Sequence, residues 1–253
     1  MPIVDRAEIS AIAHRWHPVA APVSDENIAR LISRLDLPKG GRVLDLGCGF
    51  GEWLLAALEA FPDAEGVGVD SSAPALEQAR KSAEARKLTE RVTFEEADAA
   101  EWEGEEFDVV LCVGASHAFG GLATAVPAAR SHLKPGGRLL LGEGVWETPP
   151  TPEALTAMQA EPGDLQELPN LVTDLRRFGF EPGFGHVSTA AEWDAYEWSW
   201  TGALATWALE DPGARAEALE TARTHRQEWL AGYRGQLGFV TLVLHDLGED
   251  AAE

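Results

Sequence analysis

The hydrophobic residues of this chain follow two patterns that alternate along most of its length. Short, nearly continuous apolar runs, of which 107–113 is the clearest, have the length of strands buried on both faces. Between them, hydrophobic residues recur every three or four positions, as in 28–35, which predicts amphipathic helices. This alternation predicts parallel βαβ units and therefore a doubly wound α/β sheet. The predicted strands are 43–46, 66–70, 92–94, 107–113, 138–143, 181–187 and 239–244.

Three segments depart from this alternation. Residues 1–23 carry a short helical pattern and precede the first core helix, as a lid would. Residues 145–166 are rich in Pro, Thr and Glu and read as a loop with one short helix, whereas 190–232 form a Trp-rich helical block inserted before the last strand. We therefore expect a single domain over 1–253, made of an N-terminal helical lid (1–37), a core (38–145) and a C-terminal half (146–253) with a helical cap at about 190–232.

The charge balance narrows the range of partners. Lys and Arg number 20 against 42 Asp and Glu, which gives a formal net charge of −22. Such a surface repels phosphate backbones and anionic lipid, so nucleic acid and membranes are disfavoured; the simplest role of the excess acid is solubility. No apolar run approaches the roughly 20 residues of a membrane span, and the start of the chain lacks a signal-peptide pattern. We expect a soluble, cytoplasmic protein.

The stretch 42–52, which reads Arg-Val-Leu-Asp-Leu-Gly-Cys-Gly-Phe-Gly-Glu, carries the clearest chemical signal. It predicts a strand, a tight turn and a helix start, and such a turn brings bare backbone N–H groups close to a ligand. Gly47, Gly49 and Gly51 have the spacing Gly-x-Gly-x-Gly, with Asp45 two residues ahead of the first glycine. The dinucleotide fingerprint has the spacing Gly-x-Gly-x-x-Gly instead.

Two further acids follow predicted strands. Ligands of open α/β sheets lie beyond the carboxyl ends of the strands, which is where Asp70 and Asp98 fall. Asp70 could accept both hydroxyls of a ribose or cap the next helix, and Asp98 could accept from an adenine amino group or stabilise a turn. We interpret Cys48 and Cys112 as small packing residues, in preference to nucleophiles. Two cysteines are too few for a disulfide framework or a zinc site.

These features occur in one order and at suitable intervals, and together they resemble a class I S-adenosylmethionine (SAM)-dependent methyltransferase across about residues 38–145. The resemblance rests on the glycine loop, Asp70, Asp98, the Phe107-Asp-Val-Val strand and the Leu133-Lys-Pro-Gly-Gly137 turn.

The resemblance implies a Rossmann-like, doubly wound seven-stranded sheet whose last strand is antiparallel. It also implies SAM as the cofactor, with S-adenosylhomocysteine (SAH) as its product, and no bound metal. The expected cofactor contacts are Asp45, Gly47, Cys48, Gly49, Asp70, Ser71, Asp98, Ala99 and Cys112.

Outside the core, three short patterns look like the YjhP-type bacterial methyltransferases, a likeness that leaves the substrate open. They are His14-Arg15-x-His17, Gly142-Glu143-x-x-Trp146 and Trp193-Asp194-x-Tyr196-Glu197.

Methyl transfer from a sulfonium is an in-line displacement, so the enzyme must align the acceptor and remove its proton where it carries one. His117 follows the fourth predicted strand, near the expected acceptor, and a neutral imidazole can take a proton at physiological pH. It is our first candidate for a general base, with a binding or structural role as the alternative; His17, His14 and Glu143 are further candidates. His14, Trp16, His117, Trp146, Tyr196 and Trp200 are the candidate acceptor contacts, although the aromatic residues among them could equally pack the helical cap.

The leading hypothesis is therefore a SAM-dependent methyltransferase, monomeric or homodimeric, that modifies an oxygen or nitrogen atom of a small molecule. A nucleic-acid methyltransferase is disfavoured by the charge and by the absence of an Asn/Asp-Pro-Pro-Tyr-like motif after the fourth strand. A non-catalytic SAM-binding or scaffold protein is the main alternative. A nicotinamide-dependent oxidoreductase is a weaker one, because Asp45 and the glycine spacing argue against it.

Overall fold

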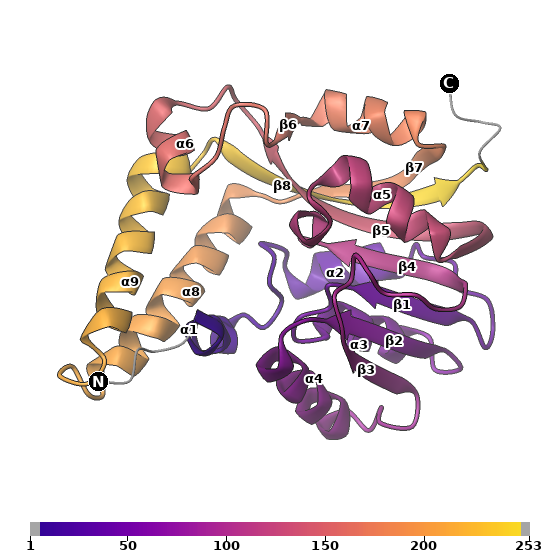
Figure 1. Cartoon of the computed structure of the whole chain (residues 1–253), viewed down its shortest axis with the longest axis horizontal. Helices are drawn as coiled ribbons and strands as arrows, with labels where there is room; N and C mark the ends of the chain where they lie inside the picture. The colour runs from indigo at the N-terminus through magenta and orange to yellow at the C-terminus, as the bar shows by residue number, and fades with distance from the viewer. Residues whose placement is uncertain (1–5, 249–253) are drawn as a thin grey trace.

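A computed structural model describes residues 6–248, so residues 1–5 of the expected lid and the final residues 249–253 lie outside the described part. Its sheet has the strand order β3-β2-β1-β4-β5-β8-β7, with the two-residue β6 paired to β5 (Figure 1). The strands are β1 (Arg42–Leu46), β2 (Glu65–Asp70), β3 (Val92–Glu96), β4 (Phe107–Val113), β5 (Leu133–Trp146), β6 (Gln166–Glu167), β7 (Phe180–Val187) and β8 (Leu237–Asp246).

The predicted doubly wound sheet with an antiparallel last strand is confirmed. β1 pairs in parallel with both β2 and β4, whereas β8 runs antiparallel to β5 and β7. The chain leaves β1 towards β2 and β3 on one side and returns to β4 and β5 on the other, so strand order reverses between β1 and β4. A cleft at the carboxyl ends of these two strands is where such sheets bind ligands.

β5 is longer than the sequence predicted. It begins at Leu133 and includes Pro135–Gly137, which we expected to be a turn before the strand. The register shows why: Phe107 pairs with Leu133 and the next paired residue, Val109, with Arg138, so the Pro-Gly-Gly segment forms an irregularity within one strand. The other unexpected strand is β6, whose two residues are too few for a periodicity to reveal.

Helices cover both faces of the sheet. Since successive strand residues point to opposite sides, neighbouring residues of one strand pack against different helices. Val43 packs with α2, α3 and α4, and its neighbour Leu44 packs with α5 and α7. These helices are α2 (Asp25–Ile32), α3 (Glu52–Ala60), α4 (Ala73–Ala85), α5 (Leu122–Ser131) and α7 (Leu168–Arg177).

The predicted helical block before β8 consists of a pair of helices that stands beside the sheet (Figure 1). Glu197 is buried in it and accepts hydrogen bonds from Tyr233 Oη at 2.6 Å and His225 Nε2 at 2.8 Å, which ties the pair together. The elements of this cap are α8 (Ala190–Leu209), α9 (Ala216–Glu228) and the π-helical turn η3 (Trp229–Tyr233), with α1 (Arg6–Ala13), η1 (His14–Trp16) and α6 (Pro152–Met158) packed against them.

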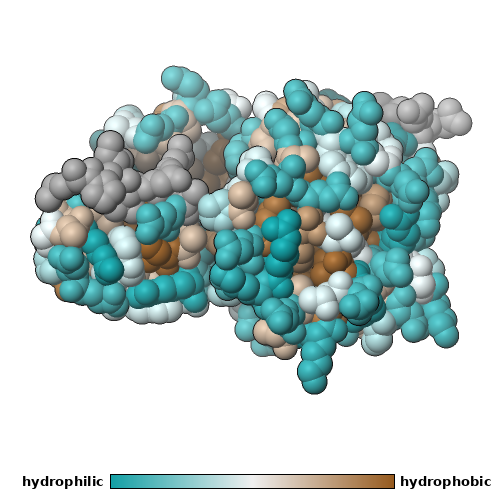
Figure 2. Space-filling model, turned by 60° about the horizontal axis from the view of Figure 1, so that its bottom comes forward, coloured by the Kyte–Doolittle hydropathy of each residue, from teal (hydrophilic) through white to brown (hydrophobic). Residues whose placement is uncertain are grey.

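Hydrophilic residues dominate the face of the molecule seen in Figure 2, and hydrophobic residues show only in small patches on it. Within the described residues, no helix is both long enough and apolar enough to cross a membrane.

Candidate functional site

The glycine loop is held in place by β2. Gly47 N and Cys48 N donate to Val69 O at 2.9 and 3.0 Å, and Gly49 N donates to Asp70 Oδ2 at 2.7 Å. Gly47 has φ +72° and approaches the turn after β4 so closely that a Cβ there would lie 2.4 Å from the Ala115 Cβ. Gly49 has φ +50°, and a Cβ there would meet no atom within 4 Å. A side chain at Gly47 is thus excluded by contact with Ala115, and at both Gly47 and Gly49 it would strain the backbone. The loop leaves open space beside Gly49.

Asp70 organises this loop as well as facing it. Its Oδ2 accepts from Gly49 N, and its Oδ1 accepts from Ser72 N at 2.8 Å. The N-cap of α4 is Ser72, whose hydroxyl accepts from Ala75 N, so Asp70 is not the helix cap. Each carboxylate oxygen has a second lone pair, which leaves Asp70 able to accept two ligand hydroxyls.

Asp98 and Ala99 follow β3 at the same edge of the sheet. Asp98 is exposed, and its Oδ1 accepts from Ala100 N at 2.9 Å, which is the turn role considered above. Its second oxygen is not used by this contact, so the turn role does not prevent it from binding a ligand. Ser71 is exposed immediately after β2.

Asp45 is the most perturbed acid of the site. It is 3% exposed, and its Oδ2 has no hydrogen-bond partner in the part of the chain that the structure describes. Burial, followed by the charge of Asp70, raises its pKa from 3.8 to about 8, while the backbone N–H of Leu54 in the first turn of α3 acts in the opposite direction. A cationic ligand group nearby would stabilise the ionised form.

Both cysteines are free and buried, and burial raises the pKa of each thiol, to about 12 for Cys112. Thiols held in this state are packing residues, not nucleophiles. Cys112, near the end of β4, is fully buried in the core between the sheet and α5, so its thiol is not exposed to a ligand.

A cavity of about 830 Å³ adjoins the glycine loop through the turn after β4. Its walls come from residues 20–22 of the N-terminal segment, the turn 114–123, the end of β5, the loop 158–166, α8 and β8. This volume lies within the range of sites for small organic molecules.

Glu143 and His117 both line this cavity. Burial raises the pKa of Glu143 above 4.5, against the effects of the Ser116 hydroxyl, the Gly144 N–H and the His117 ring. Its Oε1 accepts from Gly144 N at 3.2 Å, and its buried Oε2 has no partner in the protein. His117 is exposed on the short helix η2 (Ser116–Phe119), so it lies at the rim of the cavity.

The two N-terminal histidines lie over the loop and against α8. His14 Nδ1 donates to Ser10 O at 2.9 Å, so its Nε2 must accept from Tyr196 Oη at 3.2 Å. The His14 ring also packs on Phe50 of the glycine loop at 5.6 Å, and burial lowers its pKa. His17 packs edge-on against Tyr196, and its Nε2 contacts Ala21 O at 3.0 Å. Tyr196 lines the cavity, but neither histidine does.

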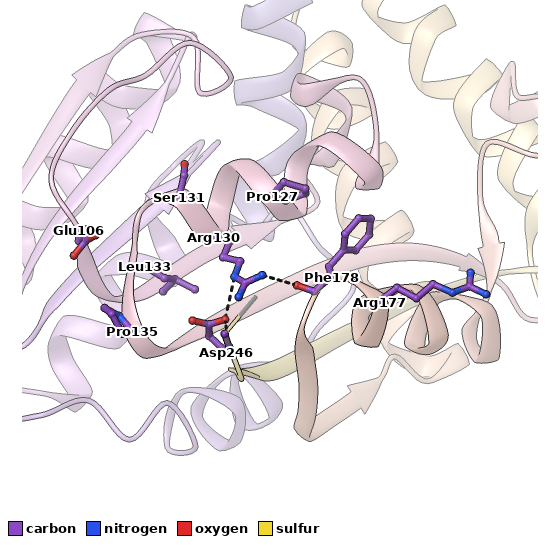
Figure 3. Close-up of a pocket in the computed structure, with 10 residues that line it drawn as sticks. Glu106, Pro127, Arg130, Ser131, Leu133, Pro135, Arg177, Phe178 and Asp246 are labelled. Carbon is purple, nitrogen blue, oxygen red and sulfur yellow. Dashed lines mark hydrogen bonds and ion pairs between the residues drawn. The ribbon is translucent and has the colours of Figure 1, made fainter. Parts of the chain in front are cut away.

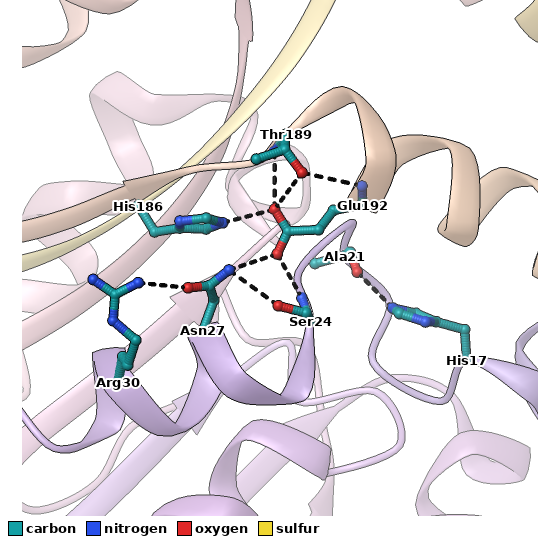
Figure 4. Close-up of polar contacts among 8 residues, drawn as sticks. All are labelled: His17, Ala21, Ser24, Asn27, Arg30, His186, Thr189 and Glu192. Atoms are coloured by element: carbon teal, nitrogen blue, oxygen red, sulfur yellow. Dashed lines mark hydrogen bonds and ion pairs between the residues drawn. The ribbon is translucent and has the colours of Figure 1, made fainter.

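Glu192 fixes the N-terminal segment to the cap (Figure 4). Its Oε1 accepts from Ser24 N at 2.9 Å and Asn27 Nδ2 at 2.8 Å, and its Oε2 accepts from Thr189 N at 2.9 Å and His186 Nε2 at 3.0 Å. Burial pushes the pKa of this carboxyl up, but the hydrogen bonds from Thr189, Asn27 and Ser24 outweigh it and hold the pKa well below 4.5. Two stretches of the chain, 24–27 and 186–192, thus meet at one ionised side chain.

Besides His14, three of the expected acceptor contacts do not line the cavity. Trp16 is 53% exposed and rests against Gly202 of α8, Trp146 is buried against Trp229, and Trp200 stacks on His225 at 4.1 Å. The alternative of cap packing describes all three.

Sequence reasoning missed two polar residues that do line the cavity. Trp193, whose Nε1 is buried without a partner, was noted only as part of a motif. Gln166 gave no signal, because it stands alone in a polar loop. Its Nε2 donates to Asp174 Oδ2 at 2.9 Å, and its Oε1 is buried without a partner.

A second cavity, of about 580 Å³, lies at the opposite edge of the sheet, near the start of β5 (Figure 3). Arg130 crosses it, with Nε 3.1 Å from Asp246 Oδ1 and Nη1 donating to Phe178 O at 3.0 Å. The Arg130 guanidinium in this cavity is therefore already paired with Asp246. Residues 6–248 contain no cluster of three or more His, Cys, Asp or Glu arranged for a metal ion.

Known proteins resemble this chain in sequence and in structure. A family model described as a methyltransferase domain matches residues 43–137. The Escherichia coli protein YjhP is 34% identical over 197 residues, which cover 77% of this chain and 79% of that protein. The crystal structure of YjhP has a TM-score of 0.85 and covers 93% of this chain and 98% of that one.

Two further crystal structures, both described as SAM-dependent methyltransferases in complex with SAH, match nearly the whole chain. The one from Geobacter sulfurreducens is 28% identical with a TM-score of 0.87, and covers 96% of this chain and 99% of that chain. The one from Thiobacillus denitrificans is 32% identical with a TM-score of 0.85, with the same coverage of 96% and 99%.

Proposed function

The chain belongs to the class I SAM-dependent methyltransferases, and on that premise we propose that it methylates an oxygen or nitrogen atom of a small molecule held in the 830 Å³ cavity. The observation that carries the proposal is the position of this cavity, which is lined by Glu143, His117 and the turn after β4, the same turn whose Ala115 approaches Gly47 of the glycine loop. The net charge of −22 argues against a nucleic-acid substrate.

The residues around the glycine loop fit the cofactor. Gly49 leaves space for close approach, Asp70 has lone pairs for two ribose hydroxyls, and the unpartnered oxygen of Asp45 suits a cationic group. SAM supplies an electrophilic methyl group on a positively charged sulfonium. We propose that it is held by Asp45, Gly47, Cys48, Gly49, Asp70, Ser71, Asp98, Ala99 and Cys112, with Cys48 and Cys112 contributing backbone only.

The remaining task of the protein is to orient the acceptor and take its proton. His117 at the rim and Glu143 within the cavity are both in position to accept it. Burial raises the pKa of Glu143, which makes its carboxylate a stronger proton acceptor than an ordinary one. His17 is less suited, because its Nε2 is engaged by Ala21 O and the residue does not line the cavity.

Asp70→Ala tests the cofactor half of the proposal. The substitution removes the ligand-facing acceptors and also releases Gly49 N, so we expect SAH affinity to fall at least about tenfold by calorimetry. Asp63→Ala, which removes an exposed carboxylate from the turn before β2, is the control. Unchanged SAH affinity in Asp70→Ala would remove Asp70 from the cofactor site.

A further inference from the structure

The cavity beside the glycine loop contains buried polar atoms that the protein does not satisfy. Glu143 Oε2, Gln166 Oε1 and Trp193 Nε1 each lack a hydrogen-bond partner among residues 6–248, and all three residues line this one cavity. Buried polar groups are nearly always paired, so several unpaired ones around one cavity indicate a ligand as their partner. Two of the three are acceptors, which call for a ligand that donates.

The orientation of Gln166 is set by the protein. Its Nε2 donates to Asp174 Oδ2, which leaves the amide oxygen as the free atom. Asp174 in turn accepts from Arg177 Nη1 at 2.7 Å through its other oxygen, so the Gln166 amide is held in this orientation.

The charges of the cavity have one sign. Its lining includes the acids Glu143 and Asp164 but no Lys or Arg. A carboxylate or phosphate brought beside Glu143 would lose its hydration, meet a second acid and find no Lys or Arg in the lining to pair with. An alcohol donates directly to Glu143, and an ammonium forms a charge-assisted hydrogen bond with it.

The remainder of the wall is largely apolar. It includes Val145, Met158, Leu165, Leu171, Leu237 and Phe239. These side chains favour an aliphatic or aromatic body next to the donor group.

We propose that this cavity selects alcohols or amines with an apolar body, bound through Glu143 and Gln166, and excludes carboxylates and phosphates. The inference rests on the proposed function, because it names the class of acceptor for that site. It goes further in assigning Gln166 and Glu143 as the residues that determine specificity.

The test compares three ligands with one carbon skeleton, 4-phenylbutan-1-ol, 4-phenylbutan-1-amine and 4-phenylbutanoate, by ligand-detected NMR titration with and without saturating SAH. We expect the alcohol and the amine to bind at least about tenfold more tightly than the carboxylate. Glu143→Gln should weaken amine binding and reduce the difference in affinity between the amine and the carboxylate. Glu167→Gln makes the same change at an exposed residue outside the cavity, and it should leave the relative affinities of the three ligands unchanged.

Equal or tighter binding of the carboxylate by the wild-type protein, or no binding of any of the three, would overturn the inference without use of a variant. The proposed function fails on different evidence, namely the absence of SAH binding or of methyl transfer. The two claims are therefore separable in one set of titrations.

Discussion

At the scale of single residues, the site depends on carboxyl groups in unlike environments. Asp70 accepts hydrogen bonds from two backbone N–H groups, whereas Asp45 is buried with an oxygen that has no partner among the described residues. Both acids were predicted from their spacing around the glycines. The difference in their surroundings and the raised pKa of Asp45 could not be predicted, because burial and hydrogen-bond partners follow only from the fold.

Asp45→Asn tests whether that buried carboxyl serves the cofactor at a cost to stability. With its pKa raised from 3.8 to about 8, native Asp45 keeps a proton that the unfolded chain releases, so the free energy of unfolding falls as pH rises through this window. Asp45→Asn should flatten that dependence in urea unfolding between about pH 5 and pH 8. It should also weaken SAH binding by about tenfold, because the amide cannot pair with a cation. If the pH dependence of unfolding is the same in Asp45→Asn as in wild type, the pKa of Asp45 is not raised. If the SAH affinity is the same, Asp45 does not bind the cofactor.

His117→Ala separates catalysis from binding. If His117 takes the proton, kcat should fall about a hundredfold or more while SAH affinity stays within about twofold, as single-turnover assays and calorimetry would measure. Glu143→Gln is the comparison, because the two residues line the same cavity. Full activity of His117→Ala together with inactivity of Glu143→Gln would assign the proton transfer to Glu143.

At the scale of secondary structure, the sheet was predictable and the cap only in outline. Buried parallel strands are continuous apolar runs, so the main strands were found in order, while β6 and the irregularity in β5 left no pattern. Periodicity placed a helical block before β8, but it cannot distinguish a wall facing a cavity from a helix–helix contact. Trp16, Trp146 and Trp200 show this, since all three pack the cap and its surroundings. Gln166 is the opposite case, a cavity residue that periodicity could not reveal, because its position depends on the pairing of β6 with β5.

Glu192 connects β7, α8 and the start of α2 through a negative charge that acid removes. Because its pKa is held well below 4.5, its contribution to stability is complete above that pH and is lost as pH falls below it. Glu192→Gln should therefore lower the free energy of unfolding at neutral pH, and the difference from wild type should shrink under acid conditions.

Chemical denaturation across that pH range measures the effect, with Glu210→Gln, at the exposed far end of α8, as the control. A constant difference at every pH would show that the charge of Glu192 does not stabilise the junction. Greater protease sensitivity of residues 14–23 in Glu192→Gln would locate the loss at the N-terminal segment.

At the scale of the whole molecule, the cavity lies where the sheet, the N-terminal segment and the cap meet. Residues 20–22, the turn after β4 and the start of α8 are far apart in the sequence and close in space, so no single stretch of sequence could have predicted its walls. The cofactor half of the site is different, because one compact motif and the ends of successive strands supply it. This explains why the sequence identified the cofactor and left the acceptor open.

Gly144 gives the most direct test that acceptors are methylated in this cavity. It lines the cavity, and a Cβ there would lie 3.5 Å from the Leu165 Cδ atoms, so alanine fits and a large side chain would fill the space. The measurement is acceptor-dependent SAH release from a panel of alcohols and amines by wild type, Gly144→Ala and Gly144→Phe, with SAH affinity measured in parallel.

We predict that wild type and Gly144→Ala release SAH, and that Gly144→Phe loses at least about 90% of this turnover while still binding SAH. Turnover by Gly144→Phe equal to that of wild type would place the acceptor elsewhere. Failure of the wild-type protein to release SAH with any acceptor would contradict the proposed function.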